Sequence, residues 1–367
     1  MKRINGIFLF FYKCFALYTL VVYALLIWFP FKDWFSGFIM MTFPVVILGH
    51  LFCLISSLLT NRLNIVLPLV LLAVGCIFLP RTYSIHFNKD DEIDNRKKTF
   101  KVMSYNVHVF RHNSDNSSDE AKTEIRDMQK WISTSGADVL CMFEYFSRRK
   151  SLLFNSNKIF ENNGYKHVAY LNKSGWNRPE DYWGLVIYSK LPITAVQDTL
   201  FMAQNGMISA DVKVGKDTVR IIALHLFSMT LKLDALSSQR TLKGLWKEGK
   251  DNAKRIKTGF INHADEMDIL ESWINVSPHP VIVCGDFNET PYSYVYGKSR
   301  SLLANSFEDR GKGFGFTFNG LPYFIRIDNQ FYNSDKINLL NFKTINNVHY
   351  SDHYPILGTY QIKSKVE

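Results

Sequence analysis

The sequence predicts an α/β domain with a layered sheet core, preceded by a membrane module of three helices. Nearly all of the first 80 residues are apolar or aromatic, whereas nearly all acidic residues lie from Asp90 onward. From Thr99, short apolar strands alternate with amphipathic helices, which is typical of a sheet covered by helices. We therefore expect an anchor at residues 1–80, a polar linker at 81–98 and a globular domain at 99–367.

Three apolar runs occupy the anchor, at about Cys14–Phe31, Gly37–Leu59 and Leu63–Pro80. Each is close to the ~20 residues that a helix needs to cross the hydrocarbon core of a bilayer. A cleaved signal peptide would explain the first run alone, but no small-x-small cleavage site follows it and two further runs do. We therefore expect three transmembrane helices that hold the chain in a lipid bilayer.

The basic residues around these runs predict an orientation. Those on one side of the three spans are Lys2, Arg3, Lys13 and Arg62, and those on the other are Lys32, Arg81 and Lys89. By a margin of one charge, the positive-inside rule places the N-terminus in the cytoplasm. Three crossings then carry the C-terminal domain to the opposite side, so we expect a multi-pass protein of the cell (inner) membrane with an extracytoplasmic domain.

Composition narrows the chemistry of the chain. It has 43 Lys and Arg against 33 Asp and Glu, a formal net charge of +10. Such a balance suits a polyanionic partner, whether nucleic acid, a phosphate-bearing substrate or an anionic membrane surface. The five cysteines show no CxxC or CxxH spacing, which argues against a cysteine zinc site and a disulfide framework.

The globular domain is expected to contain many short strands and a few helices. Strands are predicted at Phe100–His108, Asp138–Tyr145, Lys166–Leu171, Trp183–Ser189, Val281–Asn288, Ile325–Tyr332, Ile337–Thr344 and Tyr354–Ile362. A hairpin is predicted across Ile208–Val214 and Thr218–Leu226, because a Gly-Lys-Asp turn joins two apolar runs. Helices are predicted at Asp119–Ser135, at about Ser151–Asn162 and over much of Leu236–Asn275.

Polar side chains recur where these strands end, which is where a rigid sheet passes the chain to a loop. They are Asn106, Glu144, His225, Asp286, Asn288, Asp328, Asp352 and His353. Taken singly, each such residue is more often a turn residue, a strand cap or a hydrogen-bonded core histidine. Asp286 and Asn288 are two residues apart, so on a strand they point the same way. The complete set leaves little room for these structural explanations.

The set contains the groups that hydrolysis of a phosphoester requires. A hard cation such as Mg²⁺, with Mn²⁺ as the alternative, offsets the charge of the phosphate and prefers oxygen ligands. Glu144 is the natural ligand, and Asn106 can add its carbonyl oxygen. The attacking water must also be oriented and deprotonated. Asp286 is suited to this step, and Asn288 to holding the water or a phosphate oxygen.

The two histidines supply the remaining chemistry. His353 can exchange a proton near neutral pH, and Asp328 would then fix its tautomer. His225 can hydrogen-bond the phosphate. The sequence therefore predicts a metal site and an acid/base pair that meet at one edge of the sheet core.

In this order, the set resembles the endonuclease/exonuclease/phosphatase superfamily, which has the DNase I-like fold. This group contains pancreatic-type DNase, exonuclease III-like repair nucleases, neutral sphingomyelinases and inositol-polyphosphate 5-phosphatases. The resemblance covers Phe100 to about Gln361 and includes the motifs Trp-Gly-Leu-Val-Ile-Tyr-Ser-Lys, Gly-Asp-Phe-Asn, Arg-Ile-Asp and Ser-Asp-His. It implies a four-layered α/β sandwich of two packed mixed sheets flanked by helices, in a membrane-anchored member of bacterial type.

The resemblance also implies roles for single residues. It assigns Glu144 to the metal and the pair Asp328 and His353 to acid/base work. Asp286, Asn288 and His225 are assigned to the nucleophile and the phosphate. In some members the position that Asp352 matches approaches the metal.

Two departures from the family pattern bear on the branch. Repair nucleases of the exonuclease III type have no histidine at the strand of His225, whereas the DNase, sphingomyelinase and 5-phosphatase branches do. The resemblance therefore argues against a repair enzyme for abasic sites. Gly-Asp-Phe-Asn is followed by Glu289, where Asp is common in the family, and we expect little effect from this change.

A basic segment lies outside the shared motifs. Its cations recur at spacings of three and four, which places them on one helical face: Arg240, Lys243, Lys247, Lys250, Lys254 and Lys257. A neighbouring apolar stripe contains Leu242, Trp246, Ala253, Ile256 and Phe260. This segment is either a solvated surface helix or an amphipathic arm that contacts nucleic-acid phosphates or an anionic bilayer.

Three functions are compatible with these observations. The first is a membrane-tethered phosphodiesterase that acts on lipid headgroups or another membrane-associated phosphoester. The second is a membrane-anchored nuclease acting on DNA or RNA. The third is a catalytically silent protein that binds phosphorylated partners, and the complete set of metal, acid and base residues argues against it.

Overall fold

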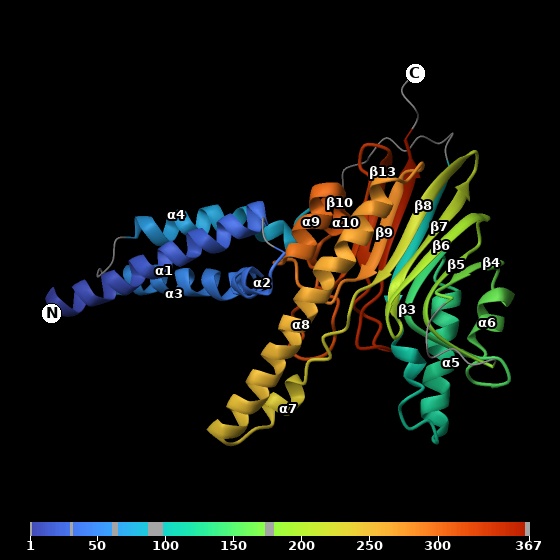
Figure 1. Cartoon of the computed structure of the whole chain (residues 1–367), viewed down its shortest axis with the longest axis horizontal. Helices are drawn as coiled ribbons and strands as arrows, with labels where there is room; N and C mark the ends of the chain where they lie inside the picture. The colour runs from blue at the N-terminus through green and yellow to red at the C-terminus, as the bar shows by residue number, and fades with distance from the viewer. Residues whose placement is uncertain (1, 30–31, 61–64, 87–97, 173–179, 364–367) are drawn as a thin grey trace.

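The computed structural model describes residues 2–29, 32–60, 65–86, 98–172 and 180–363. Figure 1 shows a helical module at the N-terminal end and a globular part built around β-strands, with one long helix, α8 (Leu242–Asn275), extending from the globular part.

Two six-stranded sheets form the centre of the globular part. The first contains, in spatial order, β13 (Ile337–Thr344), β14 (Ile356–Ile362), β2 (Thr99–Asn106), β3 (Val139–Arg148), β5 (Asp181–Ser189) and β4 (His167–Tyr170). The second contains β10 (Ala304–Asn305), β12 (Asp328–Tyr332), β9 (Val281–Asp286), β8 (Asp217–His225), β7 (Asn205–Val214) and β6 (Ile193–Met202). Both sheets are mixed, because β2 and β3 run parallel, as do β8 and β9, whereas their other pairs are antiparallel.

Apolar side chains of the two sheets pack against each other and form the main core. Val102 and Ile187 of the first sheet belong to the same buried cluster as Ile221 and Ile282 of the second. Because these strands alternate or are fully apolar, both faces of the inner strands can be covered.

Helices cover the outer faces. Apolar residues of α5 (Asp119–Ser133) and α6 (Ser156–Asn162) pack on the first sheet, and those of α8 and α9 (Tyr294–Leu302) pack on the second. The expected arrangement of two packed mixed sheets flanked by helices is therefore present.

Most predicted strands coincide with observed ones, and the differences lie at their ends. β2 ends at Asn106, and after Val107 the residues His108 to Arg111 all have positive φ values between 42° and 57°. A left-handed conformation costs roughly 1–2 kcal/mol per non-glycine residue, so this turn must be held by its surroundings. β6 was not predicted, because this edge strand is largely exposed and has no apolar alternation.

The helical module contains α1 (Lys2–Trp28), α2 (Trp34–Met41), α3 (Phe43–Thr60) and α4 (Val66–Gly75), followed by a 3-10 helix at Cys76–Arg81. Within the described residues, two stretches are long and apolar enough to cross a membrane: Ile7–Trp28, with 22 residues, and Trp34–Leu59, with 26 residues. The third expected span is a shorter apolar helix, Val66–Arg81. The expectation of three crossing helices is thus supported for two. The third falls short in length, because a crossing helix needs ~20 residues.

A buried polar cluster joins α1 and α3 inside the module. His50 Nε2 lies 2.7 Å from the hydroxyl of Thr19, and His50 Nδ1 lies 3.1 Å from the hydroxyl of Tyr12. Buried polar groups are costly unless they are paired, so this cluster favours one packing of the two helices.

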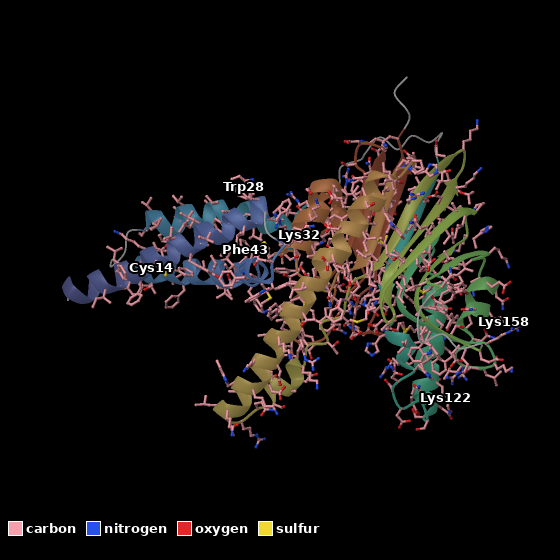
Figure 2. The ribbon with its side chains drawn as sticks, in the orientation of Figure 1. Cys14, Trp28, Lys32, Phe43, Lys122 and Lys158 are labelled. Atoms are coloured by element: carbon pink, nitrogen blue, oxygen red, sulfur yellow. The ribbon has the colours of Figure 1, made fainter. Side chains whose placement is uncertain are left out.

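The helical module docks directly on the globular part. The ring of Phe43 stacks on Tyr292 at 4.4 Å, and the buried Arg81 donates to the carbonyl oxygens of Pro291 and Leu26, each at 3.2 Å. Figure 2 shows Lys32 and Phe43 at this contact and Cys14 toward the far end of the module.

The first part of the expected linker belongs to this contact. Tyr83 and Ser84 form β1, which pairs with β11 (Gly313–Phe314) of the globular part. Residues 87–97 lie outside the described residues.

Candidate active site

Strand register brings three of the predicted residues together at one edge of the second sheet. His225 ends β8, Asp286 ends the neighbouring β9, and Asp328 begins the next strand, β12. Asp286 is the register partner of both His225 and Asp328. In the first sheet, β2 and β3 run parallel, so their carboxyl ends lie at one edge. Asn106, at the end of β2, and the β3 residues that follow its register partner Phe143 therefore approach the cluster from this sheet.

Asp328 and His353 form a buried hydrogen-bonded pair. His353 Nδ1 lies 2.9 Å from Asp328 Oδ2, and the backbone N–H of Asp328 donates to Thr317 Oγ1 at 3.0 Å. The ring of Phe318 packs edge-on against His353, with 5.2 Å between centroids. These contacts fix both the ring and its tautomer.

Both members of this pair have perturbed pKa values. Burial raises the pKa of Asp328 to about 6, although His353 opposes this effect. Burial by itself would lower the pKa of His353, but the negative charges of Asp328 and Asp286 outweigh it and raise that pKa to about 10. The pair is therefore a carboxylate and an imidazolium near neutral pH.

Asp286 lies at the centre of the cluster. Its Oδ2 accepts a hydrogen bond from Asn106 Nδ2 at 3.0 Å and lies 3.7 Å from the Nε2 atoms of both His225 and His353. Its Oδ1 accepts from the backbone N–H of Asn288 at 3.1 Å. A carboxylate with donors on several sides is held in one orientation, as a group that must orient water requires.

Glu144 reaches the cluster through an irregularity in β3. The register with β5 shifts between Met142 and Tyr145, and Glu144 itself has a φ of 48°. Its Oε1 accepts from Asn106 Nδ2 at 3.3 Å. Non-glycine residues with positive φ concentrate at functional sites, and Asn288, with a φ of 51°, is a second case beside Asp286.

Comparison with known proteins agrees with this geometry. A family model of the endonuclease/exonuclease/phosphatase family matches residues 103–353, which include every one of the residues above. The chain belongs to this family. A second model, a domain of unknown function (DUF8431), matches residues 5–82, which correspond to the helical module.

Two solved structures of endonuclease/exonuclease/phosphatase family proteins share the fold. A family protein from Bacteroides vulgatus is 12% identical, with a TM-score of 0.51 over 73% of this chain and 100% of that chain. One from Bacteroides thetaiotaomicron is 15% identical, with a TM-score of 0.50 over 73% of this chain and 99% of that chain. The human Nocturnin catalytic domain, solved with a bound sulfate anion, is 17% identical, with a TM-score of 0.49 over 72% and 94%. No curated protein matches the chain.

The endonuclease/exonuclease/phosphatase site contains groups that suit a divalent cation. Asp286, Asp328 and His353 each offer a ligand atom within 4.8 Å of the others, although His353 Nδ1 already pairs with Asp328. Glu144 is only partly buried and offers carboxylate oxygens at the same edge. Two buried atoms, His225 Nδ1 and Asp328 Oδ1, have no protein partner, which is the arrangement expected of a site that receives another polar group.

Asn106 and Asp352, the two other predicted metal ligands, are already engaged. The amide nitrogen of Asn106 faces Glu144 and Asp286, while its oxygen accepts from the backbone N–H of His108 at 3.0 Å. Asp352 Oδ1 lies 3.0 Å from His108 Nδ1. Burial alone would raise the pKa of Asp352, but the bond to His108 and the charge of His353 lower it to about 2.

His108 was not expected from the sequence. It was assigned to the end of a strand, whereas the left-handed turn after Asn106 directs it toward Asp352. The one feature of the sequence that could have indicated a role for His108 is its position two residues after Asn106. Thr317 and Phe318, which hold Asp328 and His353, come from a loop without any motif.

A buried latch connects α8 to this site. His263 Nδ1 lies 2.6 Å from Glu289 Oε1, and His263 Nε2 lies 2.8 Å from the carbonyl oxygen of Phe227, two residues after His225. Glu266 accepts from the backbone N–H of Phe227 at 3.1 Å. Glu289 stands where Asp is common in the family, and we expected this change to have little effect. In the structure its carboxylate contacts His263.

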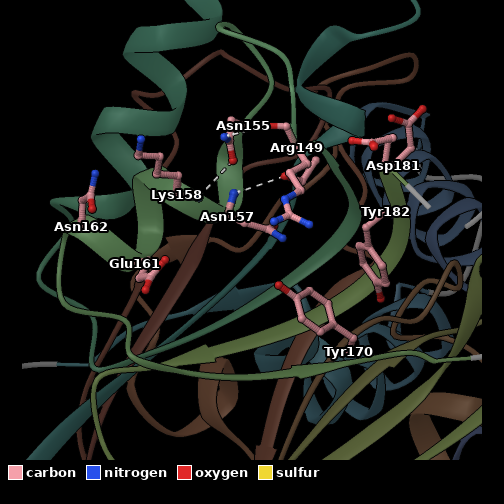
Figure 3. A pocket seen from close by; sticks show the side chains of 11 residues that line it. Arg149, Asn155, Asn157, Lys158, Glu161, Asn162, Tyr170, Asp181 and Tyr182 are labelled. Atoms are coloured by element: carbon pink, nitrogen blue, oxygen red, sulfur yellow. Dashed lines mark hydrogen bonds between the residues drawn. The ribbon is translucent and has the colours of Figure 1, made fainter. Parts of the chain in front are cut away.

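A separate polar hollow of about 630 Å³ lies between the end of β3, α6 and the strands β4 and β5 (Figure 3). Tyr170 and Tyr182 lie on one side of it and Arg149 on the other. Asn155 donates to the carbonyl oxygen of Arg149 at 2.9 Å, which fixes the rim. None of the predicted site residues lines this hollow, so it does not replace the cluster as the candidate active site.

The latch predicts a pH dependence of stability. Burial lowers the pKa of His263, but the hydrogen bond and charge of Glu289 outweigh it, so the net pKa is raised. The stability that the charged pair contributes is therefore complete below the ordinary histidine pKa of about 6.5 and is lost as pH rises through the raised value. We expect His263→Gln to lower the free energy of unfolding by about 1–3 kcal/mol at pH 6, and by less at pH 9.

Denaturant unfolding of the full chain at the two pH values measures this difference. His167→Gln, which changes a half-buried histidine in β4, is the matched control and should show no such trend. A loss for His263→Gln that is constant with pH would contradict the charged pair.

Proposed function

We propose that the chain is a divalent-metal-dependent phosphodiesterase that its N-terminal helices hold at a membrane. The observation that carries the proposal is the buried pair of Asp328 and His353, joined at 2.9 Å and packed against Asp286. Glu144 and Asn106 approach the same carboxylate from the other sheet. Family membership supports this chemistry.

In this mechanism Asp286 orients the attacking water and takes its proton. Asn106 and the backbone of Asn288 hold the carboxylate in place. Asn288 is itself fixed through its amide, which donates to the carbonyl oxygen of Leu226 at 3.1 Å, so its side chain borders the position of the water or a phosphate oxygen. Such positioning contributes much of the rate in phosphoryl transfer.

His353 acts as the acid. Its pKa of about 10 keeps the ring protonated near neutral pH, so it can donate a proton to the leaving oxygen. Asp328, bound at Nδ1, stabilises the imidazolium before the transfer and orients the ring so that Nε2 carries the transferred proton. His225, whose Nδ1 has no protein partner, is placed to hydrogen-bond a phosphate oxygen.

Mg²⁺, or Mn²⁺ in its place, would offset the negative charge of the phosphate when bound. Glu144 would hold it, with Asn106 and Asp352 as further ligands. Because Asn106 and Asp352 are engaged with His108, their recruitment would require local rearrangement of the turn after β2.

The helical module supports the placement at a membrane. Two of its helices have the length and composition of membrane spans. Figure 1 shows the globular part at the end of the module opposite to the N-terminus. We propose a cytoplasmic N-terminus and a catalytic domain outside the cytoplasm, in a multi-pass protein of the cell membrane. This topology requires the shorter apolar helix Val66–Arg81 to cross as well.

The substrate would be a membrane-associated phosphoester or a nucleic acid. The net charge of +10 suits both, and the same site can cleave either a diester or a monoester. A silent phosphate-binding protein is the alternative from another class.

Metal removal and loss of the acid test the mechanism. The full chain, reconstituted in lipid, should hydrolyse bis-p-nitrophenyl phosphate with Mg²⁺ or Mn²⁺ and lose the activity in EDTA. His353→Ala should lower kcat by roughly 10²–10⁴-fold. Turnover that persists in EDTA would refute the mechanism. Parallel assays on plasmid DNA, RNA and phospholipid vesicles would then identify the substrate class, and binding without turnover in all of them would indicate the silent protein.

A second experiment tests the proposed metal ligand. Glu144→Gln removes one negative oxygen and should raise the Mg²⁺ concentration needed for half-maximal activity by about 10-fold or more. Glu120→Gln, on the exposed first turn of α5, is the matched control. An unchanged Mg²⁺ requirement in Glu144→Gln would exclude this residue as a ligand.

Reporter fusion tests the orientation. Alkaline phosphatase fused to the C-terminus should be active, because that enzyme matures outside the cytoplasm. An inactive fusion that is nevertheless expressed and membrane-bound would place the catalytic domain inside.

A further inference from the structure

The N-terminal half of α8 projects beyond the sheets together with the short helix α7 (Leu233–Ser237) (Figure 1). We call residues 233–260 the arm. We propose that the arm is an interfacial membrane-binding element that lies on the anionic surface of the bilayer holding the helical module. This inference rests on the membrane placement proposed above and adds a second site of contact with the lipid.

The arm carries an uncovered apolar stripe. At its tip Leu242, Leu245 and Trp246 have exposed fractions of 86%, 40% and 76%. Exposure of a tryptophan and two leucines to water is unfavourable, and interfacial helices use such residues to enter the headgroup region. Because an α-helix turns 100° per residue, one stripe joins the tip to the base of the arm: Leu242, Leu245, Trp246, Gly249, Ala253, Ile256 and Phe260.

The base of this stripe contacts the helical module, and this contact fixes the direction in which the stripe faces. Phe260 packs against Phe38 with 5.6 Å between ring centroids. Lys257 Nζ lies 4.1 Å from the ring centroid of Trp34. Trp34 and Phe38 begin the second candidate membrane span. Since residues of one stripe face the same way, the tip faces the side on which the membrane spans lie.

The length of the arm gives the extent of the proposed contact. From Phe260 to Leu242 the helix rises by about 27 Å, at 1.5 Å per residue. The arm slants from its contact with the module toward the side of the N-terminal helices (Figure 1). The stripe can therefore extend the lipid contact well beyond the module itself.

The side of the arm that faces away from its lysines is covered by the chain itself. Asn252 accepts from the backbone N–H of Lys232 at 2.9 Å, and Arg255 donates to the carbonyl oxygen of Thr230 at 3.2 Å. Gly259 lies so close to Met229 that a Cβ would come within 2.6 Å of its side chain. These contacts leave the apolar stripe and the basic face beside it as the surfaces open to a partner.

The charge of the arm selects among partners. Four exposed lysines flank the stripe: Lys243, Lys247, Lys250 and Lys254. Lysines beside an apolar stripe with tryptophan and leucine complement anionic headgroups above acyl chains. A nucleic acid would pair with the lysines but would leave Leu242 and Trp246 without a partner, so the bilayer fits the whole surface better.

The arm is also connected to the active site. His263 and Glu266, on the same helix, hold the backbone of Phe227, which follows His225 by two residues. A bilayer bound along the arm would therefore hold the catalytic edge close to the lipid surface. This placement favours a membrane-associated phosphoester as the substrate.

Fluorescence of Trp246 tests the arm directly. The full chain is reconstituted in nanodiscs of phosphatidylcholine and phosphatidylglycerol, with and without bromine on the acyl chains. The contribution of Trp246 is the difference between the emission of the wild type and that of Trp246→Phe. We expect bromine to quench this contribution by about twofold or more, because interfacial helices bury their apolar face about 5–10 Å deep.

Two variants define the specificity of the result. Leu242→Glu with Leu245→Glu should remove the quenching of Trp246 while the protein stays folded and in the disc. Leu152→Glu is the matched control, because Leu152 is fully exposed between β3 and α6, on the part of the chain remote from the arm. It should leave the quenching unchanged.

The outcomes separate this inference from the membrane placement. If the chain is released from vesicles by an alkaline carbonate wash, the membrane placement fails, and the arm proposal fails with it. If the chain is retained but Trp246 stays open to aqueous iodide and unaffected by bromolipid, the arm proposal alone is overturned. Protection of Trp246 that requires an added oligonucleotide, or that rises with protein concentration, would assign the arm to a nucleic acid or to a second copy of the chain.

Discussion

The mutual burial of Asp286, Asp328 and His353 is the constraint on which the rest of the structure depends. Three ionisable groups cannot be withdrawn from water unless each is paired, because the desolvation of an isolated charge is far more costly than a hydrogen bond repays. The charge on His353 offsets the two carboxylates, and donors from Asn106 and Asn288 complete the arrangement. Strand register, the left-handed turn after β2 and the irregularity in β3 all hold these donors in place.

Several residues of the buried cluster could be predicted from the sequence because they end strongly apolar strands. Val281 to Cys284 is a fully buried run, so the position of Asp286 at its end follows from pattern alone. Asp328 and His353 were likewise expected as a pair, and they are joined by a hydrogen bond. The apolar pattern therefore predicted which residues lie close together, because parallel strands have their carboxyl ends at one edge of a sheet.

Features that arise from backbone conformation could not be predicted in this way. No residue-type signal marks a positive φ at Glu144, and the preference of Asn for that region is the only hint at Asn288. The contact between Asp352 and His108 was not predicted, because the sequence pattern assigned His108 to a strand and not to a turn. The buried contact between His263 and Glu289 joins segments 26 residues apart, and neither residue stands in a pattern that names the other.

The contact between the helical module and the globular part has a consequence for how such chains are inherited. Arg81 donates to the carbonyl oxygen of Pro291, three residues beyond Asn288, and the backbone oxygen of Arg81 accepts in turn from Arg326, two residues before Asp328. The segments that carry Asp286 and Asp328 are thus both in contact with the end of the module. A gene that lost the module would leave Tyr292 uncovered and would remove the Arg81 carbonyl oxygen, one of the acceptors of the buried Arg326. Selection should therefore keep the helical module and the globular part together in one chain. Replacement of either part by an unrelated domain should be rare unless the residues at their contact change as well.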